Sequence, residues 1–369
     1  MKTARAILAI ISSLLGLLIV LPIAAVAVPF WAVAFLVRRC SNLFAPPSKT
    51  WESIIGFDKH VGWKPNPNLD VYCSFAVGAF RVKTDSHGWR GQEDLTGCQA
   101  LVLGDSFAFG FGVDDENAFF SLTNSGLHVK AIGSPGYNMV QEVIWLDKVS
   151  TQLSGKLVVW FICLGNDLYD NLQPNMQNYR TPFVREINGT GTWEIVTTHV
   201  RPETWHYNVE RDFQKTRDAR SLGTFSRTFL SERVYSACEF LIEKATHICR
   251  QAGAPLVIVS IPSMSQLDAD AWNHWASRTG DPKLFDRDLP DQKLQAICKK
   301  FEVMFVPGSK YLSYTDYILE DGHWNEKGHK RIAKLLSSLY QQSVLNSART
   351  DPASHMTGLK PDQAVDLFH

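Results

Sequence analysis

Short apolar runs alternate with amphipathic segments along most of the chain from about residue 98 onward. Five runs rich in aliphatic and β-branched residues, each bounded by turn residues, predict strands at 100–103, 129–132, 157–163, 256–261 and 303–306. Helical spacing of apolar positions predicts helices at 138–153, 231–252, 289–300 and 326–346. This alternation predicts an α/β fold with a parallel sheet, right-handed crossovers and helices on both faces.

The first 45 residues have a different pattern and predict a membrane anchor (1–45). Residues 6–37 contain no charged side chain. As a helix with ~1.5 Å rise per residue they would extend about 48 Å, more than the roughly 30 Å of a bilayer's hydrocarbon core. The stretch is too long for the apolar region of a cleavable signal peptide, and a re-entrant hairpin around Pro22 is the remaining alternative. Basic residues flank both ends, so the positive-inside rule gives no orientation.

The rest of the chain divides by composition into three parts. Residues 46–97, rich in Gly, Pro and Trp, predict a linker and a small β-rich segment. Residues 98–345 hold the predicted sheet, and within them 172–230 form a polar, aromatic insertion. The insertion follows the third strand, so we expect it at the sheet edge where open α/β folds bind ligands. Its Trp and Tyr side chains would suit either stacking on sugar rings or plain packing. Residues 346–369 predict a polar, loosely ordered tail.

Composition argues against a nucleic-acid partner and leaves one possible disulfide undecided. The chain holds 37 Lys+Arg and 37 Asp+Glu, a formal net charge of zero, and it has no basic stripe or tail. We therefore expect no nucleic-acid partner. The cysteines include no Cys-x-x-Cys pair, so no metal site is expected. Cys73 and Cys98 could form a disulfide in an oxidising compartment, which their spacing alone leaves open.

Chemistry-bearing residues follow the first three predicted strands. Gly104-Asp105-Ser106 ends the first strand, which places a serine hydroxyl at the carboxyl edge of the sheet, where it can act as a nucleophile. The turn after the second strand contains Gly136, whose backbone N–H can approach a ligand closely. Asn166 follows the third strand and can donate its amide to a developing oxyanion. An ordinary turn at Gly136 and an Asx turn or helix cap at Asn166 are the structural alternatives.

A fourth group lies between the last predicted strand and the last predicted helix. His323 is a candidate general base, and Asp321, two residues before it, is a candidate for orienting the imidazole ring. His329 is the rival base, but it falls inside the predicted helix and is interpreted as a structural residue. A serine, an oxyanion donor, a base and an orienting carboxylate together fit nucleophilic catalysis.

In this order the four blocks resemble the SGNH/GDSL hydrolase family, over about 98–170 and 300–340. The resemblance implies a flavodoxin-like three-layer α/β/α fold with a parallel five-stranded sheet. It implies a catalytic set of Ser106, His323 and Asp321.

The resemblance also implies an oxyanion hole. Its donors would be the backbone N–H groups of Ser106 and Gly136 and the side chain of Asn166.

The chain departs from the family's usual pattern at three places. Phe107 stands where leucine is common, the Asp and His of the last block are only two residues apart, and Trp324 replaces proline. The form Asp-x-His-x-Asn-x-x-Gly is similar to that of membrane-linked branches found with bacterial polysaccharide systems. In those branches Gly-Trp-x-Pro and Gly-x-Arg-Gly segments precede the nucleophile, as 62–65 and 88–91 do here.

The resemblance implies a serine-dependent acyl-ester hydrolase that needs no metal or organic cofactor. The predicted anchor and the aromatic residues favour O-acetyl or other acyl groups of a carbohydrate or lipid near a membrane. We expect a single-pass membrane protein whose catalytic domain is periplasmic or otherwise extracytoplasmic. Two alternatives remain: an O-acyltransferase that modifies a polysaccharide with the same residues, and a non-catalytic carbohydrate-binding protein on the same fold.

Overall fold

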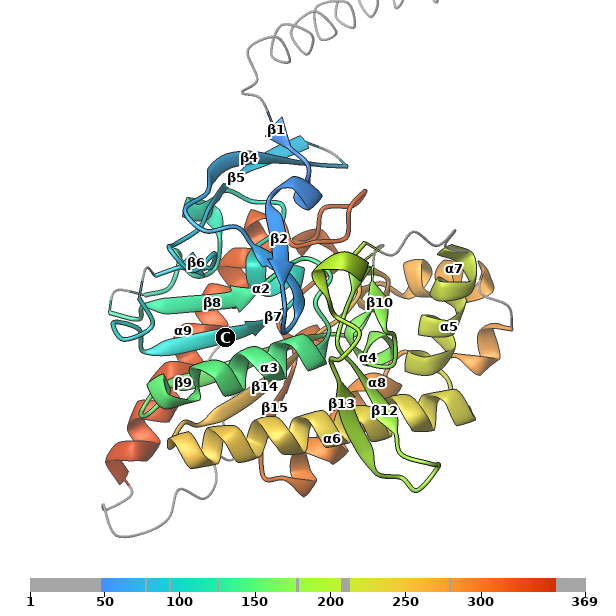
Figure 1. Cartoon of the computed structure of the whole chain (residues 1–369). Helices are drawn as coiled ribbons and strands as arrows, with labels where there is room; N and C mark the ends of the chain where they lie inside the picture. Colours follow the sequence, from blue (N-terminus) through green and yellow to red (C-terminus); the bar gives the residue numbers. More distant parts are fainter. Residues whose placement is uncertain are drawn as a thin grey trace, which may run out of the picture. The chain divides into compact units, whose positions relative to one another are not determined.

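The computed structural model describes residues 48–349, except 77, 93, 125, 177–178, 207–212 and 279–280 (Figure 1). The predicted membrane anchor (1–45) and most of the predicted tail (346–369) lie outside the described residues. Among the residues that are described, no helix combines the length and the apolar character needed to cross a membrane. From Lys49 onward the described residues form one compact unit.

A six-stranded sheet lies at the centre of this unit, in the order β15-β14-β9-β7-β8-β6. Five strands are parallel and β6 runs antiparallel to β8. The strands are β6 (Arg90–Gly91), β7 (Ala100–Gly104), β8 (Val129–Gly133), β9 (Leu157–Cys163), β14 (Leu256–Ile261) and β15 (Met304–Pro307). The five predicted strands are confirmed, and they follow the flavodoxin-like order. The short strand β6 is an addition that the apolar pattern does not predict.

The central strands are covered on both faces. Every residue of β7, β8, β9 and β14 is buried. Side chains alternate between the faces of a strand, so neighbouring residues enter different cores. In β9, Trp160 and Ile162 join one hydrophobic cluster and Val159 and Phe161 join the other. This double burial explains why the strands are near-continuous apolar runs.

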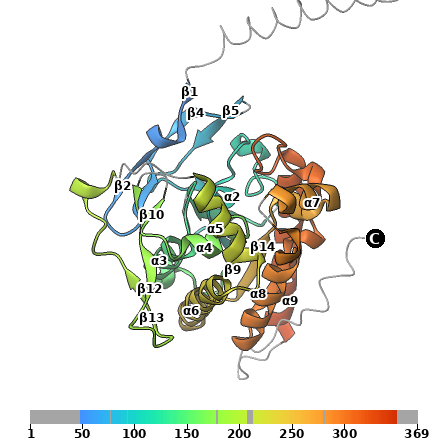
Figure 2. The same ribbon diagram turned by 90° about the vertical axis from the view of Figure 1, so that its right-hand side faces the viewer.

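Helices cover both faces of the sheet. They are α2 (Ser106–Phe109), α3 (Met139–Val149), α4 (Asp167–Asp170), α5 (Phe213–Phe225), α6 (Phe229–Ala252), α7 (Ala269–Arg278), α8 (Leu289–Lys300) and α9 (Glu326–Arg349). Apolar residues of α3, α6 and α8 belong to one cluster, and those of α9 to the other. Figure 2 shows α3 and α6 on one side of the sheet and α9 on the opposite side. The three-layer α/β/α prediction and the four predicted helices are confirmed.

Small antiparallel sheets make up the segment before β7 and much of the insertion. The first group is β1 (Ser48–Lys49), β2 (Ile55–Asp58), β3 (Gly62–Pro65), β4 (Asp70–Phe75) and β5 (Gly78–Lys83). The insertion contains β10 (Asn175–Met176), β11 (Tyr179–Arg180), β12 (Phe183–Glu186) and β13 (Trp193–Val196). Within the insertion Trp193 is buried and donates its indole N–H to the Ser236 hydroxyl at 2.9 Å, so this aromatic residue serves packing.

The cysteines are all buried where the structure describes them. Cys73 and Cys98 are free thiols, so the disulfide that the sequence leaves open is not formed. Burial raises the pKa of each of these two thiols to about 11. A thiol with so high a pKa carries little thiolate at neutral pH and is a poor nucleophile.

Candidate active site

The nucleophile candidate sits in a tight turn between β7 and α2. Asp105 caps α2, and its side chain accepts a hydrogen bond from the backbone N–H of Phe107 at 2.9 Å. Gly133, at the end of β8, lies directly against this turn. A Cβ at Gly133 would lie 2.7 Å from the Gly104 carbonyl oxygen and 2.8 Å from that of Asp105. Glycine is therefore required there, because any side chain would push the two strand ends apart.

Ser106, His323 and Asp321 come together as the sequence predicts. His323 Nε2 lies 2.7 Å from Ser106 Oγ, and His323 Nδ1 lies 2.5 Å from Asp321 Oδ1. Gly322, between the two last-block residues, has φ +88°. That left-handed conformation, which glycine adopts without strain, turns the chain sharply enough for Asp321 to reach the ring of its near neighbour. The short Asp-Gly-His spacing is thus compatible with a hydrogen-bonded relay.

Aromatic side chains hold the His323 ring in place. Its centroid lies 5.2 Å from that of Phe107 and 4.7 Å from that of Phe111. Phe107 also packs at 4.8 Å on Trp324, which is fully buried and contacts Phe161 of β9. The two aromatic departures from the family pattern therefore form one packed cluster. This cluster fixes the imidazole between the nucleophile and the carboxylate.

Asp321 is held in its ionised form by His323. Partial burial raises the pKa of the Asp321 carboxyl, but hydrogen bonds from the ring and backbone N–H of His323, and the charge of that ring, outweigh the burial. The net pKa of Asp321 lies below its ordinary value. A carboxylate that stays ionised at neutral pH can keep a proton on Nδ1 and leave Nε2 to accept one.

Asn166 lies beside the nucleophile turn, as the sequence predicts for an oxyanion donor. Its amide nitrogen donates to Asp167 Oδ1 at 2.9 Å and, more weakly, to Asp105 Oδ2 at 3.3 Å. The same Asp105 oxygen accepts from Ser106 Oγ at 3.4 Å. Asn166 occupies the cap position of α4, but its side chain makes no capping bond. The helix-cap alternative therefore does not explain this amide.

Gly136 lies in the turn after β8 with φ +79°, a conformation that favours glycine. The small β-rich segment holds this turn. Trp63 of β3 donates its indole N–H to the Pro135 carbonyl at 3.3 Å, and Tyr137 donates its hydroxyl to the Trp63 carbonyl at 2.7 Å. Residues 62–65, which lie in the segment predicted to be β-rich, thus form strand β3 and support the turn that holds Gly136. The oxyanion role of Gly136 stays a prediction.

Three buried carboxyl groups lie behind the nucleophile turn. Burial raises the pKa of Asp105 and raises those of Asp167 and Glu142 well above their ordinary values. The charge of Asp105 raises the pKa of the other two further. Asp167 accepts the backbone N–H of Cys163 at 2.6 Å, and Glu142 accepts the indole N–H of Trp160 at 2.6 Å. The Asp167 bond holds the end of β9 against the start of α4 beside Asn166, and the Glu142 bond joins α3 to the middle of β9.

His329, the rival base, does not reach the nucleophile. It is fully buried in α9, where its ring stacks on Phe119 and its Nδ1 accepts the Phe119 backbone N–H at 3.3 Å. Burial, with the charges of Arg90 and His323, lowers its pKa to about 3. A neutral, enclosed imidazole of this kind is a structural residue, as the sequence interpretation holds.

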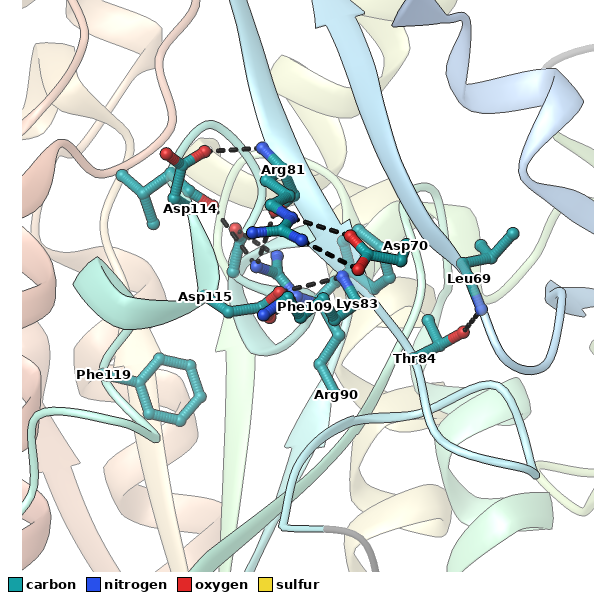
Figure 3. Close-up of polar contacts among 12 residues, drawn as sticks. Leu69, Asp70, Arg81, Lys83, Thr84, Arg90, Phe109, Asp114, Asp115 and Phe119 are labelled. Atoms are coloured by element: carbon teal, nitrogen blue, oxygen red, sulfur yellow. Dashed lines mark hydrogen bonds and ion pairs between the residues drawn. The ribbon is translucent and has the colours of Figure 1, made fainter.

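Arg90 is a residue whose importance sequence reasoning missed. It lies in β6 with no exposed side-chain surface, and its guanidinium donates to the carbonyls of Phe109 and Gly110, both at 2.8 Å. It also donates to the Asp115 carboxylate at 2.8 Å (Figure 3). Phe109 and Gly110 end the helix that begins at Ser106. Arg90 therefore ties the carboxyl end of the nucleophile helix to the segment that precedes the core.

The β4–β5 hairpin reinforces this anchor. The backbone N–H of Arg81 donates to Asp114 at 2.5 Å, and that of Lys83 donates to Asp115 at 2.8 Å. Figure 3 shows both carboxylates reaching the edge of β5, with Asp70 paired to the Arg81 side chain on the same strand pair. The sequence signal for Arg90 is its position between Trp89 and Gly91, where no other charged residue is adjacent. An arginine that is buried at such a position needs hydrogen-bond acceptors from elsewhere in the chain.

Comparisons with known proteins give low similarity values. No family model and no curated protein matches the chain. A carbohydrate acetylesterase family member from Sinorhizobium meliloti is 14% identical, with 67% of this chain and 99% of that chain covered and a TM-score of 0.38. For Est24, a carbohydrate acetylesterase from Sinorhizobium meliloti, the identity is 10%, the coverage 67% and 99%, and the TM-score 0.38. A GDSL-like lipase from Bacteroides thetaiotaomicron is 12% identical, with 66% of this chain and 88% of that chain covered and a TM-score of 0.32.

The chain resembles the SGNH/GDSL hydrolases. The resemblance rests on its own four blocks: a serine after β7, a glycine turn after β8, an asparagine after β9 and an Asp/His pair after β15. The similarity values above are too low to carry a conclusion about activity. What the SGNH-like site can do chemically follows from the contacts around Ser106.

Proposed function

We propose that the protein is a serine-dependent acyl-ester hydrolase. The observation that carries the proposal is the continuous relay from Ser106 Oγ to His323 Nε2 and from His323 Nδ1 to Asp321. A serine hydroxyl is a weak nucleophile unless a base within hydrogen-bond reach takes its proton. The 2.7 Å separation of Ser106 Oγ and His323 Nε2 meets this requirement.

The reaction proceeds through an acyl-enzyme. His323 accepts the Ser106 proton as Oγ attacks the ester carbonyl, and the tetrahedral intermediate collapses when His323 returns that proton to the leaving alcohol. Water, deprotonated by His323, then attacks the acyl-serine and releases the acid and the free hydroxyl. In this scheme the oxyanion is bound by the backbone N–H of Ser106, the N–H of Gly136 and the Asn166 amide.

The proposed substrate is an O-acetyl or other acyl ester on a carbohydrate or lipid close to a membrane. The apolar segment at 6–37 supports a membrane location. The extracytoplasmic side for the catalytic unit is part of the proposal and rests on the resemblance to membrane-linked SGNH branches. If a sugar hydroxyl replaces water in the second step, the same residues perform O-acyl transfer.

A Ser106→Ala substitution tests the proposal directly. We expect the full-length protein to react with a fluorophosphonate probe and to hydrolyse p-nitrophenyl acetate, and Ser106→Ala to lose both activities. Acceptor glycans added to the assay, with mass spectrometry of the products, separate transfer from hydrolysis. An unmutated protein that neither labels nor hydrolyses would refute the esterase and favour the non-catalytic alternative. Hydrolysis that persists in Ser106→Ala would refute the site.

The Asn166 amide is expected to contribute as an oxyanion donor. When the oxyanion forms, the weaker bond of the amide to Asp105 can be exchanged for one to substrate, while the 2.9 Å bond to Asp167 keeps the side chain oriented. Asn166→Ala should therefore lower kcat by about 10²- to 10³-fold with little change in KM.

Asn117→Ala is the matched control for this measurement, because the Asn117 amide bonds Glu326 at 3.1 Å and contacts no member of the triad in the described structure. Its steady-state constants for p-nitrophenyl acetate should match those of the unmutated protein. A kcat for Asn166→Ala within about threefold of the control would contradict the oxyanion role.

A further inference from the structure

A cavity lies among the turns that follow β14 and β15, at the edge of the sheet that carries the candidate active site. It has a volume of about 550 Å³, within the ~300–1,000 Å³ range of small-molecule sites. Its walls come from α5, from α7, from the turn after β14 and from the turn after β15. The lining residues are Arg217, Ser265, Asp268, Asp270, Ala271, His274, Trp275, Arg278 and Tyr314. The parallel strands in Figure 1 point toward the side of the ribbon where α5 and α7 lie.

One loop connects this cavity to the triad. Tyr314 lines the cavity, and three residues later the Tyr317 ring packs on Phe107, next to the nucleophile. Tyr317 also pairs by its backbone with Trp324, which follows His323. Its hydroxyl donates to the Pro262 carbonyl at 2.7 Å, at the end of β14. The loop that presents the catalytic base therefore also forms a wall of the cavity.

The cavity has a fixed aromatic wall. The Trp275 ring stacks on Trp272 with centroids 4.5 Å apart and planes at 29°, and it meets the rings of Phe225 and Phe285 at 5.3 Å each. These contacts hold the indole in one orientation, while the side chain remains half-buried and lines the cavity. A rigid aromatic ring with apolar faces suits the C–H face of a sugar ring, and it loses little conformational entropy when a ligand binds.

The polar groups around Trp275 carry balanced charge. Two guanidinium groups, Arg217 and Arg278, are matched by two carboxylates, Asp268 and Asp270. Guanidinium groups only donate hydrogen bonds and carboxylates only accept them, whereas each sugar hydroxyl does both. Because the two guanidinium groups are balanced by the two carboxylates, a strongly anionic ligand would gain no net electrostatic attraction from the lining. The lining therefore fits a neutral polyhydroxylated ligand better than a charged one.

We propose that this cavity is a subsite for a neutral sugar residue of the glycan whose ester reacts at Ser106. The inference rests on the proposed esterase function and adds to it the class of the substrate's alcohol portion. The sugar residue would stack on Trp275 and exchange hydrogen bonds with Asp270 and Arg278. The shared loop from Tyr314 to His323 would then place the acylated residue of the same chain at the nucleophile.

Glycan binding by the inactive full-length protein tests the subsite. Ser106→Ala protein is titrated with neutral hexasaccharides of glucose, mannose, galactose, xylose and N-acetylglucosamine, and with hexagalacturonate as the charged comparison. We expect at least one neutral hexasaccharide to bind in preference to hexagalacturonate. Adding Trp275→Ala should weaken that binding by about fivefold to tenfold, the effect of losing one aromatic contact.

Substitutions at two exposed residues test the subsite even if the Trp275 substitution disturbs the surrounding aromatic cluster. Asp270→Ala and Arg278→Ala alter side chains at the surface of α7, and each should also weaken binding severalfold. Absence of neutral-glycan binding, preference for hexagalacturonate, or binding that all three variants leave unchanged would overturn the subsite.

The two proposals fail in different ways. Hydrolysis of p-nitrophenyl acetate without glycan binding would refute the subsite proposal and support the esterase proposal. Binding of a neutral glycan that the cavity variants weaken, without any ester hydrolysis, would refute the esterase proposal. It would support a sugar-binding site in a non-catalytic carbohydrate-binding protein.

Discussion

Replacing His323 by alanine is expected to lower kcat for p-nitrophenyl acetate by about 10⁴- to 10⁶-fold. His323 Nε2 is the group placed to take the proton of Ser106, at 2.7 Å, and the rival His329 is enclosed in α9 and cannot replace it. Without the base, Ser106 remains a neutral hydroxyl throughout the reaction. Steady-state kinetics on the purified full-length protein, with the burst of nitrophenol measured separately, give the size of the loss.

His247→Ala is the control for this experiment. His247 is exposed on α6, so its removal changes the histidine count without touching the site. The control should keep the kcat of the unmutated protein. A His323→Ala protein that retains more than about one hundredth of the control activity, with unaltered thermal stability, would show that another group serves as the base.

Replacing Asp115 by alanine is expected to lower the free energy of unfolding by about 3 to 5 kcal/mol, a loss typical of removing one partner of a buried ion pair. The Arg90 side chain has no exposed surface, and Asp115 is the carboxylate that balances its charge. Burial already lowers the pKa of Arg90, which shows that the guanidinium sits in a poorly solvating place. Equilibrium unfolding in urea measures the loss. Activity should fall as well, because the carboxyl end of the Ser106 helix loses its anchor.

Asp70→Ala gives a matched comparison on the same strand pair. Asp70 pairs with Arg81 in similar geometry, at 2.7 Å, but the two side chains are 54% and 38% exposed. Water and salt screen such a pair, so its removal should shift the urea midpoint only slightly. Equal losses for the Asp115 and Asp70 substitutions would contradict the view that burial gives the Arg90 anchor its importance.

The sheet was predictable because burial on both faces leaves a clear signal in sequence. Strands such as β9, Leu157–Cys163, are apolar at every position, and each is bounded by turn residues. Strand β6 could not be found in this way, since two residues give no period and one of them is a buried arginine. The helices α5 and α7 were also missed. Their sequences are polar overall and their apolar residues serve a small local cluster around Trp272.

The candidate catalytic residues could be predicted one by one from the sequence, but the residues that hold them in place could not. Ser106, Asn166, Asp321 and His323 follow strand ends, so parallel topology alone brings them to one edge. The hydrogen bonds of the Asn166 amide go to two buried carboxylates, Asp105 before α2 and Asp167 in α4, and local patterns do not encode this pairing. The same is true of the arginine anchor, whose acceptors lie about 20 residues further along the chain.

The short pairing of β6 with β8 has a consequence for association between molecules. Strand β8 would otherwise be the outermost parallel strand, with a row of unpaired backbone groups. Such an edge is a template for adding strands from other chains and for aggregation. Arg90 and Gly91 cover part of this edge, and the twisted hairpins before them offer no long flat strand in its place. A fragment that begins at the hydrolase-like portion, at residue 98, would leave the β8 edge open and should precipitate or form sheet-mediated oligomers where the longer chain does not.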